Sequence, residues 1–94
     1  MPAVYILTNK LYGTLYVGFT NDLPKRVWEH QQKVVDGFSK MYGLDKLVWY
    51  EIHDSVVEGR LRERQIKKWN RDWKINLIQA KNPNWRDLSL DFNT

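Results

Sequence analysis

The sequence has 94 residues, a length that supports one small domain and leaves no room for two. Hydrophobic residues make up 43% of it and five residues are tryptophan, so a core can form without cross-links, and the absence of cysteine excludes disulfides and thiolate metal sites. The net charge of +4 favours a polyanionic partner, and because no apolar run approaches the roughly 20 residues that span a bilayer, we expect a soluble, cytoplasmic protein with no membrane partner.

Two strands are predicted at the start of the chain. Residues 3–8 are rich in β-branched and aromatic side chains, and residues 14–19 have the same character. Asn9 and Gly13 supply turn residues between them, and so short a link predicts an antiparallel hairpin. Neither segment alternates cleanly between apolar and polar residues, which indicates a sheet with both faces covered.

A helix is predicted next, from an N-cap at Asn21 to about Val35. Residues 36–46 should form a loop, and residues 47–53 are typical of a third strand. The apolar stripe of the helix comprises Leu23, Val27 and Val34.

Two further helices are predicted in the second half of the chain. Ser55 and Glu58 match a capping box, which starts a helix that should reach about Trp69. Asp72 can cap the next helix, and Asn82-Pro83 ends it because the residue before proline avoids the helical region.

The order β-β-α-β-α-α predicts an α+β fold. Its sheet would be three-stranded and mainly antiparallel, with flanking helices packed against it. We expect a single domain over residues 1–88 and a frayed tail over residues 89–94.

Glu63 is the most informative single residue. It lies on the same predicted helix face as Gly59 and Ile66, so its carboxylate should point toward the sheet. Burying an unpaired carboxylate is costly, and Glu63 therefore needs a cation. One alternative is an internal salt bridge, for example to Arg26; the other is a divalent ion such as Mg²⁺, which often takes one or two carboxylates and keeps several waters.

Two more pairs of residues could carry chemistry. Arg26 and His30 are four positions apart on one predicted helix, so their side chains point to the same place. Arg26 could bind a phosphate and His30 could carry a proton. The alternative is that both belong to an ordinary exposed face of the helix. Tyr5 and Tyr16 lie on adjacent strands and can be core packing. Gly18, on the strand face of Tyr16, leaves a gap that could admit a phosphate or a neighbouring helix.

Basic residues are concentrated between positions 60 and 74, where seven of fifteen residues are Arg or Lys. This stretch is either a solvated helix face or a phosphate-binding surface. Lys40, in the predicted loop, is a further phosphate-contact candidate or a plain exposed lysine. The candidates for nucleic-acid binding are Lys40, Lys67, Lys68, Arg71 and Lys74.

The order and spacing of these motifs resemble the GIY-YIG nuclease superfamily, and most closely its small stand-alone endonucleases. The residues that carry the resemblance are Ala3-Val4-Tyr5, Tyr16-Val17-Gly18, Arg26 and His30 on one helix, and Glu63 on a later one. The resemblance covers residues 3–88 and implies metal-dependent hydrolysis of phosphodiester bonds.

The resemblance also implies roles for individual residues. Glu63 would hold a single Mg²⁺ or Mn²⁺ ion, and Arg26 would neutralise charge on the phosphoryl oxygens. Tyr5 and Tyr16 would position and activate the attacking water, while either a tyrosine or His30 could be the general base.

Two departures from the family pattern stand out. Ala3 and Val4 occupy the places of the Gly and Ile in the family name, which should leave the strand intact. The late polar residue, usually Asn, is replaced: Lys74 falls closest to its position, with Asn76 and Asn82 as alternatives.

Three functions remain open at this level. The first is an endonuclease that cuts DNA with low sequence specificity, with RNA as a second candidate substrate. The alternative is a nucleic-acid-binding module of the same fold with little or no catalysis. The third is an interaction domain anchored by tryptophans, namely Trp28, Trp49, Trp69, Trp73 and Trp85.

Overall fold

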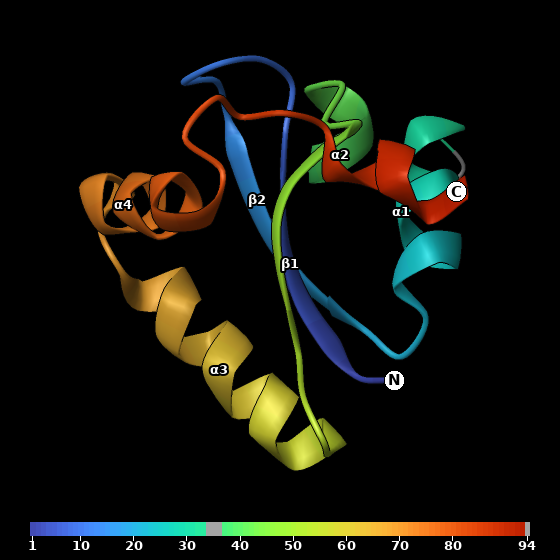
Figure 1. Cartoon of the computed structure of the whole chain (residues 1–94), viewed down its shortest axis with the longest axis vertical. Helices are drawn as coiled ribbons and strands as arrows, with labels where there is room; N and C mark the ends of the chain where they lie inside the picture. Colours follow the sequence, from blue (N-terminus) through green and yellow to red (C-terminus); the bar gives the residue numbers. More distant parts are fainter. Residues whose placement is uncertain (34–36, 94) are drawn as a thin grey trace.

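The computed structural model describes residues 1–33 and 37–93, and its centre is a three-stranded antiparallel sheet. The strands are β1 (Ala3–Thr8), β2 (Leu15–Thr20) and β3 (Lys46–Ile52), in the order β2-β1-β3. β1 is buried along its whole length because it lies between the other two (Figure 1). The predicted α+β fold and the order β-β-α-β-α-α are confirmed.

The register of the sheet places the tyrosines. Tyr5 lies directly opposite Gly18 on β2 and opposite Tyr50 on β3. Because side chains alternate between faces along a strand, Tyr16 projects from the same face as Gly18 and therefore as Tyr5.

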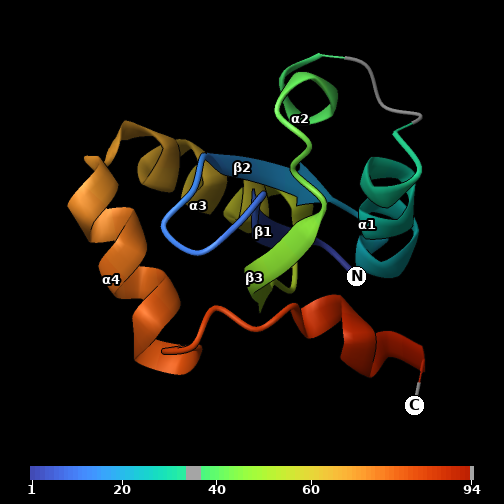
Figure 2. The same ribbon diagram turned by 90° about the horizontal axis from the view of Figure 1, so that it is seen from above.

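Helices cover both faces of the sheet. One face packs against α3 (Val56–Lys68) and α4 (Arg71–Lys81) through Val4, Ile6, Ile66 and Ile78. The other face packs against α1 (Leu23–Gln31) and the 3-10 helix η1 (Leu88–Asn93). Figures 1 and 2 show α3 and α4 on one side of the strands and α1 with the C-terminal segment on the other.

The start of α1 differs from its prediction by one residue. Asp22, not Asn21, is the N-cap, and its side chain accepts a hydrogen bond from the backbone N–H of Lys25 at 3.3 Å. Pro24 has no N–H of its own, so its position in the first turn leaves no donor without a partner. Leu23 and Val27 are buried as predicted.

The end of α1 and the following loop also differ from the sequence prediction. The helix ends at Gln31, short of the predicted Val35, which lies with Val34 outside the described residues. The predicted loop contains a single helical turn, α2 (Phe38–Met41).

The N-cap of α3 is the predicted residue, whereas the N-cap of α4 is not. Ser55 caps α3 as predicted and accepts a hydrogen bond from the N–H of Glu58 at 3.2 Å. Asn70 caps α4 in place of the predicted Asp72, and its side chain accepts from the N–H of Trp73 at 2.9 Å. Asp72 therefore lies in the first turn, where its negative charge favours the helix N-terminus.

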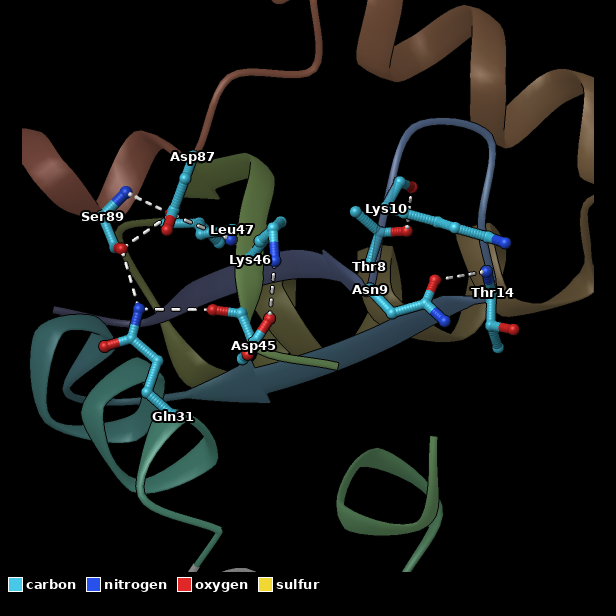
Figure 3. A network of polar contacts seen from close by, with 10 residues as sticks. All are labelled: Thr8, Asn9, Lys10, Thr14, Gln31, Asp45, Lys46, Leu47, Asp87 and Ser89. Atoms are coloured by element: carbon cyan, nitrogen blue, oxygen red, sulfur yellow. Dashed lines mark hydrogen bonds and ion pairs between the residues drawn. The ribbon is translucent and has the colours of Figure 1, made fainter. Parts of the chain in front are cut away.

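The C-terminal segment is tied to the rest of the domain by polar side chains (Figure 3). The Gln31 amide donates to the Ser89 hydroxyl at 3.0 Å and to the Asp45 carbonyl at 3.2 Å. The Asp87 carboxylate accepts from the N–H of Leu47 and from both the N–H and the hydroxyl of Ser89. Where a frayed tail is predicted, residues 88–93 thus form a 3-10 helix with Ser89 buried.

The tryptophans divide between core and surface. Trp49 and Trp85 are buried, whereas Trp28 and Trp73 are more than half exposed. A core role thus accounts for only part of the tryptophan content. Among the described residues, no helix has the length and apolar character needed to cross a membrane.

Candidate active site

Three aromatic rings from three different elements converge on one face of the sheet. Tyr5 of β1 is 1% exposed and His30 of α1 is 4% exposed. The Tyr5 hydroxyl lies 3.1 Å from Nε2 of His30, within hydrogen-bond distance. The ring of Tyr16 is centred 6.2 Å from that of Tyr5 and 5.6 Å from that of His30. The structure therefore brings together two strand tyrosines and a helix histidine that the sequence separates.

Gly18 makes this arrangement possible. A Cβ atom at Gly18 would lie 2.5 Å from the ring and hydroxyl of Tyr5 and 2.9 Å from the ring of Tyr16. The gap above Gly18 is thus filled by Tyr5, and not by the phosphate or helix that the sequence suggested.

Arg26 lies beside a surface pocket at the edge of the sheet. Its Nε atom is 3.5 Å from Oε1 of Glu29, one turn further along α1. The pocket is formed by the end of β2, the start of α1 and one residue of α3, and it is lined by Phe19, Thr20, Asn21, Asp22, Lys25, Arg26, Glu29 and Arg60.

Glu63 is buried on α3, as predicted, but its partners are not the predicted one. Oε1 of Glu63 is 3.2 Å from Nη1 of Arg60, and Oε2 is 2.9 Å from Nζ of Lys67. The salt bridge to Arg26 suggested by the sequence does not form, because Arg26 pairs with Glu29. Gly59 allows α3 to lie close to β2, since a Cβ atom there would be 2.5 Å from the Phe19 ring.

Burial and neighbouring charges both act on the pKa of Tyr5. Burial raises the pKa of Tyr5 well above its ordinary value, and the neighbouring Tyr16 raises it further. The charge of Arg26 lowers the pKa of Tyr5, and that of Glu63 raises it. Arg26 and Glu63, from opposite sides of the sheet, are thus both close enough to act on the same hydroxyl.

His30 is held as a neutral imidazole. Burial lowers the pKa of His30, the positive charge of Arg26 lowers it further, and Glu29 opposes them. A neutral imidazole has one acceptor nitrogen, so Nε2 can accept the hydrogen bond of the Tyr5 hydroxyl.

The lowered pKa of His30 makes the stability of the fold depend on pH. Below about pH 6.5 His30 takes up a proton in the unfolded chain, whereas in the folded chain its lowered pKa keeps it neutral to lower pH. The free energy of unfolding should therefore fall as the pH drops from 7.5 to 5. His30→Gln should remove part of this fall, measured by urea unfolding at several pH values. His53→Gln is the matched control, and identical pH slopes for wild type and His30→Gln would contradict the expectation.

The predicted nucleic-acid-binding residues have different surroundings. Lys67 pairs with Glu63, and Arg71 donates to the backbone carbonyls of Tyr12 and Gly13, so that it holds the β1–β2 loop. Lys68 is exposed near the end of α3, and Lys40 is exposed on α2.

The rest of the basic stretch does not form one uniform surface. Lys74 is half-buried on α4. Arg62 lies 3.1 Å from Glu51 of β3 and packs over the Trp69 ring. In contrast, Arg60 and Arg64 line a pocket together with Glu63 and Lys67. Arg60 lies three positions before Glu63 and Arg64 one position after it, and this spacing could have identified both as neighbours of the carboxylate.

The three candidates for the late polar position also differ. Asn82 is buried at the end of α4, where its amide donates to the Val48 and Arg86 carbonyls and accepts from the Arg86 N–H. Asn82 therefore has a structural role in this fold. Asn76 is exposed beside Trp69 and Trp73, in a shallow pocket between α3 and α4.

The donor set is compatible with one hydrated divalent ion. Among the described residues, no three His, Cys, Asp or Glu side chains are grouped to hold a metal. Glu63 offers a single carboxylate, which suits Mg²⁺ because this ion is commonly bound through one or two carboxylates, water and substrate phosphate.

Most of the chain matches one family of known proteins. Residues 1–76 match the family model described as the GIY-YIG catalytic domain. The chain belongs to the GIY-YIG family. This GIY-YIG chain is 38% identical over 93 residues to a UPF0213 protein of Clostridium perfringens, with 99% of each chain covered. It is 33% identical over 75 residues to a UPF0213 protein of Staphylococcus saprophyticus, a match that covers 80% of this chain and 90% of that one.

A solved structure supports the same assignment. The solution NMR structure of a UPF0213 protein from Bacillus halodurans superposes on this GIY-YIG chain with a TM-score of 0.57, at 26% identity and with 93% of each chain covered. The resemblance predicted from the motifs is confirmed. Ala3 and Val4, which replace the Gly and Ile of the family name, are both buried within β1, so the strand is preserved.

Membership of the GIY-YIG family supports a nuclease role with a nucleic-acid substrate. GIY-YIG nucleases are generally dependent on a divalent metal.

Proposed function

We propose that the protein is a divalent-metal-dependent endonuclease of the cytoplasm that hydrolyses phosphodiester bonds in DNA with low sequence specificity. One observation carries the proposal: the buried Tyr5 hydroxyl is hydrogen-bonded to His30 and lies within electrostatic reach of both Arg26 and Glu63. A proton carrier, a phosphate-binding cation and a carboxylate around one hydroxyl are the groups that metal-assisted hydrolysis requires.

In this proposal the charged residues act on the phosphate. Glu63 would hold the divalent ion, which when bound supplies positive charge to the scissile phosphate and the leaving oxygen. Arg26 neutralises charge that develops on the phosphoryl oxygens, and its guanidinium fork fits a phosphate in two-point contact. Tyr16 orients the attacking water together with Tyr5.

His30 is the proposed proton acceptor. The raised pKa of Tyr5 makes its phenolate unfavourable, whereas the lowered pKa of His30 keeps an acceptor nitrogen available at neutral pH. As the hydroxyl oxygen of Tyr5 takes the proton of the attacking water, the proton of Tyr5 moves to Nε2 of His30. Tyr5 thus remains neutral, and the positive charge is carried by the imidazole of His30, where the neighbouring Glu29 partly compensates for it.

The substrate would be held through its phosphates. Arg60, Arg64 and Lys67 surround Glu63, and Lys68 follows on the same helix. Contacts to phosphate position the backbone but carry no sequence information, which supports low sequence specificity. RNA has the same phosphate chemistry and is the second substrate to test.

Removing two of these cations should reduce the salt dependence of binding. For Arg64→Ala/Lys68→Ala, the slope of log affinity against log salt should decrease by about 2 for duplex DNA, because two phosphate contacts are lost. Fluorescence anisotropy between low and physiological salt measures this slope. Lys46→Ala/Lys81→Ala removes the same charge near β3 and should leave the slope nearly unchanged; equal slopes in all three proteins would refute the phosphate-binding role.

The function itself is tested with a panel of substrates. Purified protein is incubated with single-stranded, duplex, nicked and branched DNA and with RNA, in the presence and absence of Mg²⁺ or Mn²⁺. Metal-dependent cleavage of at least one DNA form is expected. If the protein binds these forms and cuts none of them with either metal, the non-catalytic binding module replaces the endonuclease.

A further inference from the structure

We propose that Arg60 and Lys67 make metal binding at Glu63 dependent on nucleic acid. In the free protein these two cations occupy both carboxylate oxygens of Glu63. Phosphate groups of the substrate would attract Arg60 and Lys67 and so release Glu63 for the divalent ion. This inference rests on the proposed function, because it takes Glu63 as the metal ligand and a phosphodiester as the substrate.

The ion pairs block the carboxylate from both ends. Arg60 precedes Glu63 by three positions and Lys67 follows it by four, so all three side chains lie on one face of α3. The Glu63 side chain is only 11% exposed, and each of its oxygens has a cation within 3.2 Å. A metal ion that approaches the free protein must therefore compete with two positive charges already in place.

These ion pairs contribute little to holding the fold together. Arg60, Glu63 and Lys67 all belong to α3, so the ion pairs among them connect α3 to no other element. Salt bridges with structural roles elsewhere in the chain do cross between elements, as Arg62 of α3 does with Glu51 of β3. The two cations around Glu63 thus compensate the charge of a buried carboxylate and do not join α3 to the rest of the fold.

Both cations are free to turn toward a phosphate. The side chains of Arg60 and Lys67 are 56% and 51% exposed. Arg60 also packs its guanidinium 4.4 Å from the centre of the Phe19 ring and lines both the pocket of Arg26 and the pocket of Glu63. A small rotation of Arg60 can therefore move its donors from Glu63 toward a phosphate beside Arg26, while the contact with Phe19 is kept.

The exchange links the two ligands. Once Arg60 and Lys67 contact phosphate, Glu63 is a buried carboxylate without its cations, and a divalent ion restores the balance of charge. Because linkage is reciprocal, nucleic acid should raise the affinity for metal and metal should raise the affinity for nucleic acid by the same factor.

The test measures metal binding directly, without activity. Mn²⁺ is titrated into the protein and free Mn²⁺ is followed by electron paramagnetic resonance, alone and with a phosphorothioate single-stranded oligonucleotide that resists cleavage. We expect the oligonucleotide to raise the Mn²⁺ affinity of wild type at least tenfold. Arg60→Gln/Lys67→Gln should bind Mn²⁺ at least tenfold more tightly than wild type without any oligonucleotide, and the oligonucleotide should add little.

A second pair of variants separates the possible failures. Lys46→Gln/Lys81→Gln removes the same charge away from α3 and should change Mn²⁺ affinity less than threefold, whereas Glu63→Gln should abolish the site in every background. If Glu63 binds Mn²⁺ and removal of Arg60 and Lys67 leaves the affinity unchanged, the gating is refuted and the nuclease stands. If Glu63→Gln leaves Mn²⁺ binding intact, the metal site of the proposed function fails.

The double variant could lose stability because it leaves Glu63 unpaired. Lys67→Gln alone keeps Arg60 on Glu63 and should show an intermediate gain in Mn²⁺ affinity. Circular dichroism of each variant confirms folding before titration, and a folded single variant with wild-type affinity would also count against the proposal.

Discussion

Glu63→Gln is expected to reduce metal-dependent cleavage by roughly 1,000-fold, because an ion that stabilises transition-state charge contributes several kcal/mol to catalysis. The amide has the size of the carboxylate but lacks the charge that holds a divalent cation. Affinity for nucleic acid should be retained or increased, since Arg60 and Lys67 lose their anionic partner and become available to phosphate. Single-turnover cleavage and anisotropy binding on the same oligonucleotide measure the two effects.

Glu58→Gln is the matched control for this change. Glu58 lies in the exposed first turn of the same helix, so its substitution removes an identical charge without altering the pocket. The control should cleave at the wild-type rate. Loss of binding together with cleavage in Glu63→Gln would indicate that Glu63 organises the surface, and undiminished cleavage would exclude it as the metal ligand.

Arg26→Ala should lower the cleavage rate at saturating substrate by roughly 100- to 1,000-fold, the cost of removing one preorganised donor from a developing anion. The fall should appear in the rate constant more than in affinity, because other cations remain to bind the substrate. The loss of Arg26 also removes a positive charge that lowers the pKa of His30, so the acid limb of the pH–rate profile should move to higher pH.

Arg26→Lys tests which property of Arg26 matters. Lysine keeps the charge but lacks the planar fork, so it should restore only part of the rate while largely restoring the pH profile. Full recovery by lysine would show that charge alone suffices. A wild-type rate in Arg26→Ala would remove Arg26 from the proposed site.

The strands, the main helices and their order could be predicted from the sequence because residue propensities and capping patterns agreed with one another. The capping box at Ser55 and the β-branched character of the strands each had one interpretation, and both are confirmed. The cap errors arose where two good caps lie within two residues, at Asn21 and Asp22 and again at Asn70 and Asp72. Propensity cannot choose between such neighbours, because the choice depends on where the first turn packs.

The candidate site was predictable in its parts but not in its contacts. The spacing along α3 was sufficient to identify Arg60 and Lys67 as neighbours of Glu63, whereas the partner suggested by the sequence, Arg26, pairs with Glu29. Contacts between distant segments had no sequence signal: Arg71 reaches the β1–β2 loop across more than fifty positions. The hydrogen bond between Tyr5 and His30, 25 positions apart, likewise needed the fold.

The hydrogen bonds of Gln31, at the end of α1, connect this helix to a part of the chain that follows the family match. The family match stops at residue 76, but Gln31, in the last turn of the helix that carries Arg26 and His30, is bonded to Ser89. Ser89 is in turn bonded to Asp87, which also holds the start of β3. The unit covered by the family model is therefore smaller than the unit that includes the polar contacts of α1. A chimaera that exchanges only residues 1–76 between relatives would separate α1 and the start of β3 from the segment that is hydrogen-bonded to them.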